Sequence, residues 1–195
     1  MDFELPKEIT AKLAEIDAFN QREIKPLEQE NIQFFDHRRE YARTDWDRDG
    51  QPREEWNDLI AEMERRADKA GFLRLGLPKA IGGGGASNLM IAAIREHLAG
   101  QGLQLANDLQ DESSVVGNFP IVPILHEYGT PEQKQYIEGI IGRENHLAFA
   151  LTEPDHGSDA TCFLWRASKT FGRAERLTTG PVKLRSPPKI GRAHV

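Results

Sequence analysis

Apolar residues recur three to five positions apart through most of the first 145 residues, and this spacing constrains the fold more than any other feature. Such spacing gathers apolar side chains on one face of an α-helix, which can then be buried. It predicts helices over residues 6–30, 52–70, 87–98 and 130–141, and a broken helix over 113–128. The chain is therefore expected to be mainly α up to about residue 145.

Capping and turn residues delimit these helices. Ser87 is a predicted N-cap, and Thr130 with Gln133 predicts a capping box. Pro26 is expected to kink or end the first helix. The glycine run 82–85 lacks the Gly-Lys-Ser/Thr ending of a phosphate-binding loop, so it is expected to form a flexible turn.

The segment 36–51 is dense in charge and ends in the turn signal Asp49-Gly50. Runs of this kind usually face solvent. We expect a solvated connection between two helices, with Trp46 as its anchor.

Charge and composition exclude several classes of protein. The net charge of −6 argues against a nucleic-acid partner. Apolar runs reach only about five residues, whereas a membrane-spanning helix needs roughly 20. One cysteine and dispersed histidines predict neither a disulfide scaffold nor a metal site. The acidic start, Met1 to Glu4, has no apolar targeting segment, so a cytoplasmic location is expected.

The segment 149–160 carries the most specific chemistry. The apolar run 147–151 predicts a short buried strand, and Thr152 and Ser158 add hydroxyl groups at its end. Gly157 would let a ligand approach the backbone, so this edge can hold a planar polar ring. The alternative is a strand that stops at a proline, with a serine that only caps a turn.

Three ordered motifs resemble those of the acyl-CoA dehydrogenases. Residues 151–154 followed by 157–160 are similar to the flavin-binding signature of that family. The segment 129–134 lies upstream at the spacing found in the family, and Leu77-Pro78 before the glycine run is similar to another family turn. The resemblance covers roughly residues 1–161.

The resemblance implies an N-terminal helical domain, a β-barrel domain and a C-terminal four-helix bundle, with FAD between barrel and bundle. Phe149, Leu151 and Thr152 would lie against the isoalloxazine ring, where Thr152 hydrogen-bonds the ring edge. Gly157 and Ser158 would meet the flavin chain, and Ser158 would also touch the acyl-CoA. The fold class expected here is the N-terminal helical domain followed by the first strand of a truncated β-barrel.

The implied reaction oxidises acyl-CoA to trans-2-enoyl-CoA. A glutamate base removes an α-proton, and hydride passes from the β-carbon to the flavin. An electron-transfer flavoprotein then accepts the electrons, and full-length members are commonly homo-oligomers. Because the glutamate lies in the C-terminal bundle of the family, we expect no catalytic residue in this chain and an inactive fragment.

The resemblance ends near Cys162, where the composition also changes. Residues 1–162 carry a net charge of −13, whereas 163–195 carry +7. We expect residues 1–145 to be the helical domain, 146–161 the start of the barrel domain, and 162–195 an aberrant, disordered basic tail. We expect the tail to be translated from a shifted reading frame or from adapter DNA, since its last six residues can be encoded by the start of a common sequencing adapter.

Two other functions stay open. A flavin oxidase or monooxygenase would share the helical domain and differ at the position of the absent glutamate. A non-catalytic helical interaction module would use the basic tail as a ligand-binding arm, and stable folding without flavin would favour it.

Overall fold

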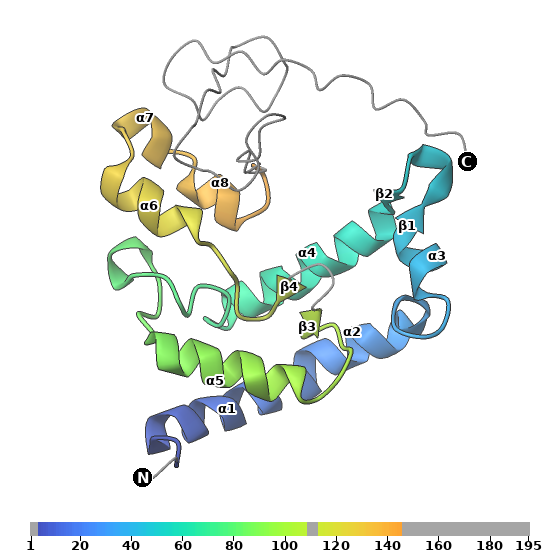
Figure 1. Ribbon diagram of the computed structural model, residues 1–195, viewed down its shortest axis with the longest axis horizontal. Coiled ribbons are helices and arrows are strands. Elements are labelled where there is room, and N and C mark those ends of the chain that lie inside the picture. The colour runs from blue at the N-terminus through green and yellow to red at the C-terminus, as the bar shows by residue number, and fades with distance from the viewer. Residues whose placement is uncertain (1–3, 109–112, 146–195) are drawn as a thin grey trace, which may run out of the picture. The chain divides into compact units, whose positions relative to one another are not determined.

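The computed structural model describes residues 4–108 and 113–145 (Figure 1). The chain forms two compact units, residues 1–128 and 129–195, and each is described by itself. The longer helices of the first unit are α1 (Lys7–Phe19), α2 (Lys25–Glu30), α4 (Glu54–Lys69), α5 (Asn88–Ala99) and α6 (Ile121–Tyr128). The prediction of a mainly helical fold is confirmed for the described residues.

Short elements connect these helices. They comprise a π-helical turn η1 (Asn20–Ile24), the 3-10 turns η2 (Ile32–Phe34), η3 (Trp46–Arg48) and η4 (Lys79–Ile81), and the short helix α3 (Arg39–Arg43). Two antiparallel pairs of two-residue strands complete the unit: β1 (Thr44–Asp45) with β2 (Gln51–Pro52), and β3 (Asn107–Asp108) with β4 (Ser113–Ser114). Thr44 pairs with Pro52, and Asn107 pairs with Ser114.

The first helix does not end at Pro26. Instead, α1 continues through the π-helical turn η1 into α2, where Pro26 occupies the first turn. The amide of Lys25 donates to the carbonyl of Asn20, five residues earlier. Proline has no amide hydrogen to donate, so it is best tolerated in the first turn of a helix. The π-helical turn ends one α-helical segment and lets a new one begin just before Pro26. Of the two expected effects of Pro26, ending the helix is therefore wrong, because helical structure continues to Glu30 as predicted, and the irregularity next to the proline is the π-helical turn.

The apolar face of α4 supplies much of the core of the first unit. Its predicted core residues are all buried: Trp56, Leu59, Ile60, Met63 and Ala67. On α5, Ser87 caps the first turn by accepting from the amide of Met90, as predicted. Ala93, Ile94 and Leu98 are buried there, whereas Leu89 is 57% exposed, so only part of the predicted face is covered. Helices α1 and α5 lie side by side (Figure 1).

The segment 36–51 is more structured than a solvated connection. It contains α3 and the β1–β2 hairpin, whose turn has left-handed backbone at Asp49 and Gly50. Trp46 is 62% exposed, so the prediction that it anchors the segment was wrong. Its ring lies over the turn, about 3.8 Å from where a Cβ of Gly50 would stand, and the hairpin is too short to carry it into the core.

The glycine run is tightly packed, which contradicts the expected flexible turn. A Cβ on Gly83 would lie 2.0 Å from the carbonyl oxygen of Leu77. The amide of Gly83 donates to the carbonyl of Pro78, and the amide of Gly84 donates to that of Arg74. Glycine is required here because two stretches of backbone approach too closely for a side chain.

The segment 113–128 is only partly helical. It begins with β4, and Val115 and Val116 follow in a bend and are fully buried before α6 begins at Ile121. The broken helix predicted for the whole segment is therefore correct for its second half alone. The sequence gives no periodic signal for the β3–β4 pair, because each strand is only two residues long.

The described part of the second unit contains α7 (Pro131–Lys134) and α8 (Ile137–Ile141). The predicted capping box is present: the Thr130 hydroxyl accepts from the amide of Gln133, and the Gln133 side chain accepts from the amide of Thr130. The helix predicted over 130–141 is divided into two short helices. The strand predicted at 147–151 lies outside the described residues.

Candidate functional site

The predicted flavin and acyl-CoA residues lie outside the described residues. They are Phe149, Leu151, Thr152, Gly157 and Ser158. Their roles remain predictions. The site that the structure does describe is a cluster of buried polar groups around the β3–β4 hairpin of the first unit.

The four residues that form the β3 and β4 strands are polar and buried. Asn107, Asp108, Ser113 and Ser114 expose 4% or less of their surface. The Ser114 hydroxyl donates to the carbonyl of Ala106 and accepts from the amide of Val116. Among the residues that the structure describes, the Asn107 side-chain nitrogen and the Ser113 hydroxyl have no hydrogen-bond partner. Burying polar atoms without a hydrogen-bond partner costs free energy, so this hairpin is a place where the fold gives up stability.

A buried ion pair joins this hairpin to α3. Arg43 Nη2 lies 2.7 Å from Asp108 Oδ2, and the two side chains are 8% and 0% exposed. Arg43 Nε also donates to the carbonyl oxygen of Phe34 at 2.8 Å. The guanidinium carbon lies 4.1 Å from the centre of the Trp56 ring, close enough for a cation–π contact. These contacts hold Arg43 and Asp108 in place.

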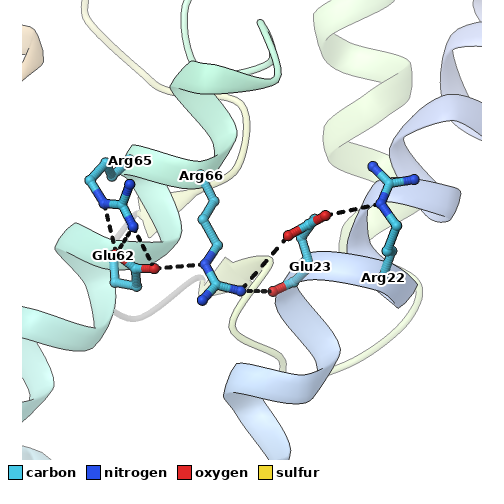
Figure 2. Close-up of polar contacts among 5 residues, drawn as sticks. All are labelled: Arg22, Glu23, Glu62, Arg65 and Arg66. Atoms are coloured by element: carbon cyan, nitrogen blue, oxygen red, sulfur yellow. Dashed lines mark hydrogen bonds and ion pairs between the residues drawn. The ribbon is translucent and has the colours of Figure 1, made fainter.

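A second set of charges joins η1 to α4 (Figure 2). Arg66 Nη1 donates to the carbonyl oxygen of Glu23 at 2.9 Å, and Arg66 Nε donates to Glu62 Oε1 at 2.7 Å. Partial burial raises the pKa of Glu62, but hydrogen bonds from Arg66 and Arg65 outweigh it, so the pKa lies below its ordinary value. The carboxylate therefore stays ionised and the network stays paired at neutral pH.

The described residues contain no cluster of three or more histidine, cysteine, aspartate or glutamate side chains that could hold a metal ion.

No helix among the described segments is both long and apolar enough to span a membrane.

Comparison with known proteins places the chain in a family. Residues 21–144 match the model of the acyl-CoA dehydrogenase N-terminal domain, so the chain belongs to the acyl-CoA dehydrogenase family. The predicted family resemblance is thereby confirmed. No solved structure matches the chain significantly.

Several curated proteins are similar to this chain over about 100 residues. Acyl-CoA dehydrogenase FadE12 of Mycobacterium tuberculosis is 35% identical over 105 residues, 53% of this chain and 26% of that protein. A 3-(aryl)acrylate reductase of Clostridium sporogenes is 36% identical over 51% of this chain and 25% of its own. The caffeyl-CoA reductase-Etf complex subunit CarC of Acetobacterium woodii is 34% identical over 55% and 27%. The matched region thus spans about a quarter of each relative.

Sequence reasoning missed the buried polar cluster. Arg43 stands in a run of charged residues that usually face solvent, and Asp108 follows no recognisable motif. Their partnership spans 65 positions of sequence, so no local spacing could have indicated it.

Proposed function

We propose that this chain supplies the N-terminal helical domain of a flavin-dependent oxidoreductase that acts on acyl-CoA thioesters. The observation that carries the proposal is the family match over residues 21–144. The sequence of the flavin-binding signature at 151–160 follows that region directly and supports flavin use. In this proposal residues 1–145 form the helical domain, 146–161 begin the barrel domain, and 162–195 take no part in the site.

In the proposed site, FAD is the acceptor for the hydride that leaves the β-carbon of the acyl group. Thr152 would hydrogen-bond the edge of the flavin ring, and Phe149 and Leu151 would lie against the ring. Gly157 would allow a close approach of the backbone, and Ser158 would contact both flavin and acyl-CoA. The base that removes the α-proton is assigned to no residue of this chain, so we propose that the 195 residues alone do not turn over.

The proposed substrate is an acyl-CoA, and the proposed electron partner is an electron-transfer flavoprotein. The second of these rests on CarC, whose own name places it in a complex with an Etf. Two of the three relatives described above are named as reductases, which favours a second candidate. In that case the same site would reduce the carbon–carbon double bond of an unsaturated thioester instead of forming it.

A chimera tests the proposal. Residues 1–161 of this chain replace the equivalent region of FadE12, which supplies the remainder of the enzyme. The purified chimera is expected to hold flavin, detected by its visible absorbance. Anaerobic addition of a saturated acyl-CoA is expected to bleach that absorbance. Bleaching by a saturated substrate indicates the dehydrogenase direction. If an unsaturated thioester reoxidises the chemically reduced chimera, and a saturated acyl-CoA does not bleach the oxidised one, the chimera acts as a reductase.

The matched variants are Thr152→Val and Thr130→Val in the same chimera. Both remove a threonine hydroxyl while keeping its shape, but only Thr152 is assigned to the flavin edge. We expect Thr152→Val to lose flavin or to slow its reduction at least 10-fold, and Thr130→Val to retain both. A folded chimera without flavin, or with flavin that neither substrate affects, would contradict the proposed function.

A further inference from the structure

Two neighbouring helices of the first unit bring three polar side chains together. Asp17 lies on α1, His97 lies on α5, and Gln101 lies in the turn that follows α5. The two helices pack against each other, as Figure 1 shows. His97 and Gln101 are four residues apart, and both side chains reach Asp17. These three side chains are called the α1–α5 cluster below.

The polar atoms of the α1–α5 cluster form a small triangle. His97 Nε2 lies 2.8 Å from Asp17 Oδ1, and Gln101 Nε2 lies 3.0 Å from the same oxygen. The two nitrogens lie 3.0 Å from each other. The second carboxylate oxygen, Asp17 Oδ2, is also only 2.9 Å from His97 Nε2. Each edge of the triangle is thus as short as a hydrogen bond.

Hydrogen bonds alone do not satisfy this triangle. If His97 Nε2 carries a hydrogen, it donates to Asp17, and the amide nitrogen of Gln101 then faces a second donor. If His97 Nε2 carries none, it accepts from Gln101, and its lone pair then faces two carboxylate oxygens. Rotating the carboxamide of Gln101 by half a turn places its oxygen against the carboxylate instead. One unfavourable contact therefore remains in each arrangement of the hydrogens.

A divalent metal ion removes this conflict. Two ligand atoms that bind one ion at about 2.0–2.1 Å and at right angles lie about 2.8–3.0 Å apart. The three edges of the triangle have these lengths. The neutral imidazole and the carboxylate are both metal ligands, and rotation of the carboxamide brings the oxygen of Gln101 to the third corner. That rotation gives up only a 3.4 Å contact with Gln104.

We propose that the α1–α5 cluster binds a divalent first-row transition-metal ion through Asp17, His97 and Gln101. An imidazole ligand favours ions such as Co²⁺, Ni²⁺ and Zn²⁺ over Mg²⁺ and Ca²⁺, which prefer oxygen ligands. The side chains of Asp17 and His97 are 42% and 31% exposed, so an ion can reach them from solvent. Asp17 and Gln101 also line a cavity of about 410 Å³, which leaves room for water at the remaining positions of the ion.

Sequence spacing does not indicate this site, because Asp17 and His97 are 80 positions apart. The third ligand is a carboxamide, so the cluster contains only two side chains of the acidic and histidine types that make up most metal sites. It forms only because α1 and α5 pack together.

Calorimetric titration of the full chain with Co²⁺ tests the proposal. We expect one saturable site that the His97→Gln variant lacks and that Mg²⁺ does not fill. Asp17→Asn keeps the shape of the side chain but removes its charge, and it should weaken Co²⁺ binding at least about 10-fold. His37→Gln is the matched control, because His37 is an exposed histidine outside the cluster, and Co²⁺ binding should be unchanged in this variant.

Two further measurements locate the ion. Paramagnetic Co²⁺ shifts or broadens the NMR signals of nearby nuclei, so the signals of the three ligands should respond at the lowest Co²⁺ concentrations. If His97→Gln does not fold, Gln101→Leu replaces it, because Gln101 is exposed and its loss leaves the contact between His97 and Asp17 in place. This variant should also weaken Co²⁺ binding at least about 10-fold.

Four results would each overturn the proposal. They are the absence of saturable Co²⁺ binding, equal binding of Mg²⁺, a first NMR response away from the cluster, and an unchanged Co²⁺ affinity in a folded His97→Gln or Gln101→Leu protein.

Discussion

Removing Asp108 should destabilise the first unit far more than removing an exposed carboxylate. Asp108→Leu removes the carboxylate that lies 2.7 Å from the guanidinium of Arg43, whose side chain is 8% exposed. Breaking a buried pair in this way typically costs 3–5 kcal/mol. Arg43 keeps the carbonyl oxygen of Phe34 and the face of Trp56, so we expect about 3 kcal/mol. With an m-value of about 2 kcal/mol/M, the urea midpoint should fall by roughly 1.5 M.

The double substitution Arg43→Met with Asp108→Leu separates two explanations of such a loss. If the loss comes from an unpaired buried charge, removing both charges should restore part of the stability, although the contacts of Arg43 with Trp56 and Phe34 are also lost. We expect a remaining loss of about 1–2 kcal/mol, less than that of Asp108→Leu alone.

Urea unfolding of the full chain, followed by circular dichroism at constant pH and salt, measures these differences. Glu15→Gln is the control, because Glu15 belongs to an exposed pair with Lys12, and a change of no more than about 0.5 kcal/mol is expected. The single variant Arg43→Met is measured in the same way. The reasoning is refuted if Asp108→Leu lowers the free energy of unfolding by less than about 1 kcal/mol, or if the loss in the double variant equals the sum of the losses in Asp108→Leu and Arg43→Met.

Three further predictions follow from the described contacts. Gly83→Ala should lower the free energy of unfolding by about 1–3 kcal/mol, because the new Cβ would lie 2.0 Å from the Leu77 carbonyl oxygen. Gly100→Ala is the control, because its Cβ would have its nearest contact at 3.4 Å, and the melting temperature should fall in the first variant and change little in the second. Thr130→Ala should lower the stability of the second unit by about 1 kcal/mol and speed hydrogen exchange of the α7 amides, because it removes the N-cap. Unchanged exchange would rule out the cap as a stabilising feature. The lowered pKa of Glu62 means that its contribution to stability is present above its unfolded pKa and is lost as pH falls through the folded value. Glu62→Gln should therefore flatten stability against pH between about 5 and 3, and an unaltered profile would contradict this.

Features that depend on nearby residues could be predicted from the sequence. The buried face of α4, the Ser87 cap and the Thr130 capping box all rest on spacings of four residues or fewer, and the structure has each of them. Trp46 was predicted wrongly, because whether an aromatic ring reaches the core depends on the path of the hairpin that carries it.

The packed glycine run was missed for a related reason. A run of glycines indicates a flexible backbone when it is considered alone. In the structure the glycines are needed because Leu75 and Leu77 of the preceding loop lie too close for side chains at this point. The same applies to the polar cluster, where Arg43 and Asp108 come from distant segments. The family motifs succeeded where periodicity could not, because they carry information on a whole fold in a few positions.

The π-helical turn shows how a local rule and a distant contact act together. Pro26 cannot donate to a carbonyl in the preceding turn, which favours a change of hydrogen-bond register just before it. That change leaves helical carbonyls in need of donors, and Arg66 of α4 donates to one of them, the carbonyl of Glu23 (Figure 2). The proline is visible in the sequence, but the arginine that completes the turn lies 43 residues away. The turn also holds Asn20 in a buried position, so the burial of this polar side chain accompanies a change of helical register that apolar spacing alone does not indicate.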